Sequence, residues 1–126
     1  SDKYSDDSFL AFETVFATIS DRGADVVLDR AKALYAMNPN FTPVLNMMGY
    51  AYMEKGDLDN AGKKFQEQIR RASGSANPYD SMGDYYLEID NKADALRYFE
   101  QSAKMGLKAS VSKADSLRNE LNKENN

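Results

Sequence analysis

The chain repeats one short stretch, which reads NMMGYAY at residues 46–52 and DSMGDYY at residues 80–86. In both copies a Met precedes a Gly, and a Tyr follows at the third position after that Gly. The offset in residue number from Gly49 to Gly83 is 34. A self-match at a fixed spacing of this length indicates a repeat architecture, in which copies of one supersecondary unit stack on one another.

The same offset continues downstream, where Ala61 matches Ala95 and Phe65 matches Phe99. Around these positions the apolar residues recur at the three- and four-residue steps of an amphipathic helix. Each unit contains two such stripes in succession, which are Leu45, Met48, Gly49 and Tyr52, then Leu58, Ala61, Phe65, Ile69 and Ala72 in one unit, and Tyr79, Met82, Gly83 and Tyr86, then Ala95, Leu96, Phe99 and Ala103 in the next. Each unit is therefore predicted to be a pair of helices, in which small residues allow close approach and the two phenylalanines fill the space beyond.

Residues with helix-capping preferences stand where these helices should begin and end. Thr42 precedes Pro43, and Asn77 precedes Pro78, so each pair places a capping side chain before a proline at the first helical position. The residues at the predicted starts of the second helices are Asp57 and Asn91. Glycine favours helix ends because it adopts the left-handed conformation, and the glycines at predicted ends are Gly23, Gly56, Gly74 and Gly106.

This unit resembles the repeat of the tetratricopeptide-repeat (TPR) family, which has the same length. The residues that carry the resemblance are Met48, Gly49, Tyr52, Gly56, Ala61 and Phe65, with Met82, Gly83, Tyr86, Ala95 and Phe99 in the next unit. The chain departs from the family pattern at Asp90, which replaces the glycine between the two helices. The resemblance implies an all-α fold, in which helix-turn-helix repeats stack as a short right-handed superhelix and bind other proteins. Residues 77–86 also resemble TPR segments of bacterial extracytoplasmic proteins.

The segments on either side of the two clear repeats match the pattern in part. The predicted boundaries are 6–39 for a degenerate capping repeat, 42–75 and 76–109 for two repeats, and 110–122 for a C-terminal capping helix. In the degenerate repeat Phe16 replaces the packing glycine, so its two helices should lie further apart. We therefore expect about seven helices in a single domain over residues 1–126.

Composition argues against several classes of protein. The 126 residues are 42% hydrophobic and 29% charged, which suits one soluble domain. The net charge of −4 argues against a nucleic-acid partner, and no run of about 20 apolar residues favours membrane insertion. The chain has no Cys and no His, which excludes disulfides, Cys/His metal sites and imidazole catalysis. We expect no enzymatic activity, no catalytic residue, no cofactor and no metal ion.

In the TPR family the first helix of each repeat lines the binding surface, so the resemblance implies candidate positions on these helices. The predicted peptide-binding residues are Asn46, Met47, Tyr50, Met53 and Glu54 in one unit, and Asp80, Asp84 and Glu88 in the next. The three carboxylates recur at i, i+4 and i+8 and form one acidic line, next to a strip of Met and Tyr. A partner polypeptide that satisfies both would carry basic and apolar groups. Because this hypothesis places the acidic line in solvent, changing its carboxylates to amides should leave folding nearly unaffected.

The acidic line is also consistent with a solvated helix face, whose charges Arg71, Lys92 or Arg97 would partly neutralise. The clamp that binds acidic C-terminal tails in the TPR family is not matched, because its positions here carry Asp80 and Asp84, which would repel such a tail. A metal site on the same carboxylates is disfavoured, because carboxylates on one helix seldom complete a metal shell.

Two other functions fit the sequence. The chain could be the accessory TPR domain of a larger extracytoplasmic enzyme. It could also be a self-assembling scaffold, in which two molecules pair through Phe9 and Phe12. The expected oligomeric state is a monomer or a weak homodimer. The sequence does not identify the protein or peptide partner.

Overall fold

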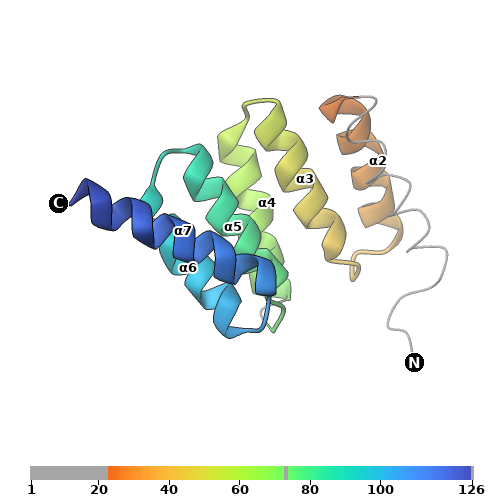
Figure 1. The fold of residues 1–126 in the computed structure, drawn as a ribbon. Helices are drawn as coiled ribbons and strands as arrows, with labels where there is room; N and C mark the ends of the chain where they lie inside the picture. Colours follow the sequence, from red (N-terminus) through yellow and green to blue (C-terminus); the bar gives the residue numbers. More distant parts are fainter. Residues whose placement is uncertain (1–22, 73, 126) are drawn as a thin grey trace. The chain divides into compact units, whose positions relative to one another are not determined.

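The computed structural model describes residues 23–72 and 74–125, and helices connected by short turns make up these ranges (Figure 1). The described helices are α2 (Ala24–Met37), α3 (Pro43–Glu54), α4 (Leu58–Arg71), α5 (Asn77–Glu88), α6 (Lys92–Lys104) and α7 (Lys108–Glu124). The predicted all-α class is confirmed. The first helix of the predicted degenerate repeat falls on residues 1–22, outside the described residues, as do Phe9, Phe12 and Phe16.

The chain divides into two compact units, Ser1–Gln68 and Ile69–Asn126, and the boundary lies inside α4. Unit 1 contains α2, α3 and most of α4. Unit 2 contains α5, α6 and α7. The assignment of residues 1–126 to one domain, and the superhelix, stay predictions.

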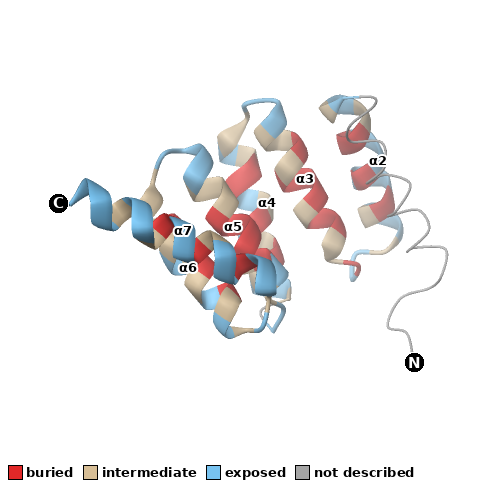
Figure 2. Cartoon of the chain, viewed as in Figure 1, coloured by how far each residue is buried: buried red, intermediate tan, exposed pale blue. Residues whose placement is uncertain are grey.

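In unit 1, α2 and α3 enclose an apolar core, and Figure 2 shows buried residues along both helices. The core side chains are all exposed by 4% or less, and they are Val27, Leu28, Ala31, Leu34, Phe41, Val44, Leu45, Met47, Met48 and Ala51. Phe41, in the loop between α2 and α3, is completely buried. The hydroxyl of Tyr35 on α2 donates a hydrogen bond to Glu67 Oε2 on α4 at 2.9 Å, so α4 is joined to α2 as well.

In unit 2, α6 packs against both α5 and α7. Its core consists of Ala95, Phe99, Ala114 and Leu117, with Tyr86, Leu96 and Leu121 packed against it. The closing helix was predicted over residues 110–122, and α7 extends a little further at both ends. Its buried residues are small or apolar, whereas most of its outer side is exposed (Figure 2).

The turn between α3 and α4 and the turn between α5 and α6 have the same backbone hydrogen bond. Asp57 N–H donates to the carbonyl of Tyr52 at 2.9 Å, and Asn91 N–H donates to that of Tyr86 at 2.8 Å. Gly56 has a φ of 80° at this turn, and Asp90 has a φ of 60°. Asp90 therefore adopts the left-handed conformation of the glycine that it replaces, which an L residue does at a cost of about 1 kcal/mol or more.

The predicted starts of the second helices are confirmed, because Asp57 and Asn91 immediately precede α4 and α6. The side chain of Asp57 accepts hydrogen bonds from Asn60 N–H at 3.3 Å and Asn60 Nδ2 at 2.7 Å, and these bonds lower the pKa of Asp57 below its usual value. Asn91 Oδ1 accepts from Asp94 N–H at 3.1 Å.

The predicted starts of the first helices need correction. Pro43 is the first residue of α3 as expected, but Thr42 makes no side-chain capping bond. Asn77 is itself the first residue of α5 and not its cap, because the helix begins one residue earlier, after Ala76. Both residues before these helices already have helical φ and ψ angles, so the backbone turns into the helix without a side-chain acceptor.

A phenylalanine ring lies against a glycine backbone in each unit. A Cβ atom added at Gly49 would be 2.3 Å from Cε1 of Phe65, and one added at Gly83 would be 2.4 Å from Cε1 of Phe99. Non-bonded carbon atoms do not approach this closely, so a side chain at either position would force the phenylalanine ring or the helix to move. The glycines thus set the distance between the two helices of each pair, as the repeat spacing predicted.

We predict that Gly83→Ala destabilises the protein by about 1–3 kcal/mol, because the new methyl group overlaps the Phe99 ring. At an unobstructed helical position the same change would stabilise by about 0.5–1 kcal/mol. Chemical denaturation measures the difference, with Gly74→Ala as the control, because a Cβ at Gly74 meets nothing within 4 Å. A Gly83→Ala variant as stable as the wild type would contradict the packing described here.

Candidate functional site

The acidic line lies on α5, which carries Asp80, Asp84 and Glu88 and has no Lys or Arg. The three carboxylates differ sharply in exposure. Asp80 is buried, with 7% of its surface accessible, Asp84 is half-buried, and Glu88 is exposed. The line therefore runs from the protein interior at the start of α5 to solvent at its end.

Lys113 on α7 is the main charge partner of the buried end of the acidic line. Its Nζ lies 2.9 Å from Asp80 Oδ2 and 3.1 Å from Asp84 Oδ1, and it sits 5.4 Å from the ring centroid of Phe99. Partial burial by itself would lower the pKa of Lys113, but the bond to Asp80 and the charge of Asp84 outweigh it and raise that pKa above its usual value. The ammonium group is therefore charged at neutral pH.

A buried chain of hydroxyl groups completes the surroundings of Asp80. Ser110 Oγ lies 2.7 Å from Asp80 Oδ1 and 2.8 Å from Ser102 Oγ, and Ser102 Oγ donates to the carbonyl of Ala76 at 2.9 Å. Ser102 and Ser110 are both completely buried. These bonds connect the start of α5 to α6 and α7, so Asp80 has a structural role in unit 2.

The predicted acidic line is thus corrected in part. Asp80 is not a solvent-facing residue, because Ser110 and Lys113 occupy both of its oxygens. Of the three residues suggested as neutralising partners, Lys92 pairs with Glu120 and Glu124, and Arg97 pairs with Asp94. Glu88 has no ion-pair partner among the described residues.

The predicted residues on α3 also divide into buried and accessible ones. Met47 has 2% of its surface accessible and belongs to the core of unit 1, so it is removed from the predicted surface. Tyr50 is half-buried, with its ring edge-on to Phe65 at a centroid distance of 5.1 Å. Asn46 and Met53 are half-buried and Glu54 is exposed. The role of these four residues in binding stays a prediction.

The sequence contains one feature from which the partners of Asp80 could have been predicted, namely their spacing from Asp80 in the repeat. Lys113 follows Asp80 by 33 residues, close to one repeat length, and Ser110 follows it by 30. If α7 is the first helix of a further, incomplete repeat, residues at these offsets are expected beside α5. The periodicity within one helix does not contain this information, because it depends on the register between two helices.

Two other properties of the described residues bear on function. No group of three or more acidic side chains is placed to hold a metal ion within the ranges that the structure covers. None of the helices α2 to α7 combines the length and the apolar character needed to cross a membrane.

No protein-family model and no curated protein matches this sequence. Solved structures do match its fold. They include the Sgt2 TPR domain from Aspergillus fumigatus, with a TM-score of 0.80 and 12% identity over 96% of this chain and 83% of that chain. The chain has the tetratricopeptide-repeat fold.

Two further TPR structures similar to this chain contain peptides. The first TPR of Spaghetti (RPAP3), bound to the HSP90 peptide SRMEEVD, has a TM-score of 0.75 and 10% identity over 90% of this chain and 92% of that one. The Yersinia enterocolitica type III secretion chaperone SycD, in complex with a peptide of the translocator YopD, has a TM-score of 0.74 and 10% identity over 95% and 98%. At such identities the similarity shows the fold alone.

We predict that Asp80→Asn destabilises this TPR fold by about 1–2 kcal/mol, because an amide has one acceptor oxygen where Ser110 and Lys113 need two. This replaces the expectation that amides on the acidic line leave folding unaffected. The matched control is Glu88→Gln on the same helix, which should change stability by less than about 0.5 kcal/mol. Equal stabilities of the two variants in urea titrations would show that the buried pair contributes nothing.

Proposed function

We propose that this chain is a protein-binding TPR module, which acts as an adaptor or scaffold by holding a basic and apolar segment of another polypeptide. The observation that carries the proposal is a repeated, exposed carboxylate. Glu54 is the last residue of α3 and Glu88 is the last residue of α5, and the two are one repeat length apart. Both side chains are exposed.

Neither carboxylate has a stabilising role in its own helix. The carboxyl end of a helix carries partial negative charge, so a carboxylate there is unfavourable by about 0.3–1 kcal/mol. The last turns of α3 and α5 contain no basic residue, and Lys55, which directly follows α3, is paired with Asp25. A Lys or Arg of a partner would meet the negative charge of the side chain and of the helix end together, so these positions favour a basic ligand.

Peptide binding by other TPR structures supports the same class of function. The HSP90 peptide bound to the first TPR of Spaghetti ends in EEVD and is acidic. This chain offers carboxylates on α5 and no basic residue there, so we propose a partner of opposite charge. Binding of this kind needs no reaction chemistry, and we assign no enzymatic activity to the module.

The proposal is tested with a phage-displayed library of random dodecapeptides. Peptides selected on the wild type should be enriched in Lys and Arg together with large apolar residues, and their affinity should fall as salt is added, because accessible charges are screened over about 8 Å at physiological ionic strength. We predict that the double variant Glu54→Gln/Glu88→Gln binds them about three- to tenfold more weakly by fluorescence anisotropy, with a smaller salt dependence.

The control removes the same number of charges elsewhere, at the exposed residues Asp29 and Asp59. Asp29→Asn/Asp59→Asn should retain wild-type affinity. The proposal is wrong if no peptide is enriched, if the enriched peptides are acidic, or if both double variants bind equally well.

A further inference from the structure

Unit 2 contains a cleft that is lined by residues of α5, α6 and α7. Its volume is about 370 Å³, and it is lined by Leu87 from α5, Phe99 from α6, and Ser112, Lys113, Ser116, Leu117 and Glu120 from α7. Binding pockets for small groups in proteins begin at about 300 Å³. The cleft therefore has room for one or two side chains of a partner.

The wall of the cleft on α5 is an exposed apolar residue. Leu87 has 42% of its surface accessible. Leu117 and Phe99, which also line the cleft, are buried, with 5% and 0% of their surfaces accessible. Ser116, which lines the cleft from α7, is exposed and small. A leucine next to an unfilled space loses hydrophobic stabilisation that an apolar group entering the cleft would restore.

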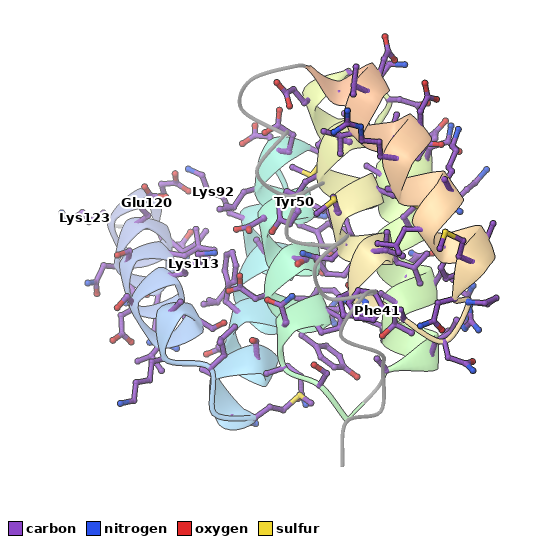
Figure 3. All side chains as sticks on the ribbon, turned by 90° about the vertical axis from the view of Figure 1, so that its right-hand side faces the viewer. Phe41, Tyr50, Lys92, Lys113, Glu120 and Lys123 are labelled. Carbon is purple, nitrogen blue, oxygen red and sulfur yellow. The ribbon has the colours of Figure 1, made fainter. Side chains whose placement is uncertain are left out.

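The charges around the cleft are predominantly negative. Lys113 is already bonded to Asp80 and Asp84, so its charge is satisfied within the protein. In Figure 3, Lys113 points from α7 toward α5, and Glu120 lies near Lys92. The carboxylates near the cleft are Asp80, Asp84, Glu88, Glu120 and Glu124, and the lysines that pair with them are Lys92 and Lys113, which leaves three negative charges.

Two of these carboxylates are available to a ligand. Glu88 is exposed and follows Asp84 by four residues, on the face of α5 that Lys113 of α7 contacts. Glu120 lines the cleft itself, and its contact with Lys92 is 3.7 Å, longer than the 2.6 Å between Lys92 and Glu124. A cation placed near Leu87 would therefore meet carboxylates on both sides, one from α5 and one from α7.

We propose that the α5–α7 cleft is the anchoring site of the partner, and that it binds a large apolar side chain with a Lys or Arg close to it in the partner's sequence. The apolar side chain packs between Leu87 and Leu117. The basic group pairs with Glu88 or Glu120, because Lys113 already occupies Asp80 and Asp84. This inference rests on the proposed binding function and adds to it the place and the chemistry of the anchor.

The test uses one lysine- or arginine-containing dodecapeptide from the library selection, with its affinity measured by fluorescence anisotropy. Ser116→Trp fills the cleft from an exposed position and should weaken binding by about tenfold or more. Leu87→Ala, also at an exposed position, should weaken it about three- to tenfold. Replacing the large apolar residue of the peptide by Ala should have an effect similar to that of Leu87→Ala and should not add to it fully.

The matched control is Val111→Ala, which truncates an apolar residue of α7 that is 46% exposed and does not line the cleft. It should change affinity by less than about twofold. Circular dichroism checks that all three variants keep their helices. The cleft is excluded as the anchor if Ser116→Trp and Leu87→Ala bind the peptide as tightly as Val111→Ala does. If that result accompanies a loss of binding in Glu54→Gln/Glu88→Gln, the binding function stands and only the cleft fails, whereas a library that yields no binder overturns both.

Discussion

Gly49 and Gly83 set the distance between the paired helices, because neither residue has a side chain. Each glycine lets a phenylalanine ring from the following helix reach the backbone, and any Cβ at that position would overlap the ring. The contact fixes how close the two helices lie, and so determines which residues of α3 and α5 remain accessible. It occurs twice, one repeat length apart, which is why the repeat is visible in the sequence before any helix is assigned.

Polar contacts hold α7 in addition to its apolar ones. Ala114 and Leu117 fill the core beside Phe99, while Ser110 and Lys113 bond to Asp80. Burying a polar group costs free energy unless the group is paired. Asp80 on α5 therefore depends on Ser110 and Lys113 of α7, and the pairing lasts only while α7 is packed against α5. Lys113 pairs with Asp80 and Asp84, the first two carboxylates of α5. The end of that helix, with Leu87 and Glu88, is therefore the part that a ligand can reach.

Helix positions could be predicted from the sequence much better than the surface could. The glycine and phenylalanine spacing, with Asp57 and Asn91, gave the helix pairs and two of their starts correctly. Met47 could not be separated from its neighbour Met48, because one residue rotates a helix by only about 100° and the buried face spans at least that angle. The burial of Asp80 depends on the register between α5 and α7, which no pattern within one helix reports.

In our proposal, a polypeptide partner binds unit 2 at the end of α5 and along α7. Nitrogen–proton correlation spectra of the wild type, titrated with a selected basic and apolar peptide, test it most directly because they report every backbone amide without a substitution. The largest shift changes should fall on residues 84–90 and 112–120, with smaller ones around Glu54 and little change in α2. Shift changes confined to residues 24–50, or spread evenly over the chain, would rule out this binding site.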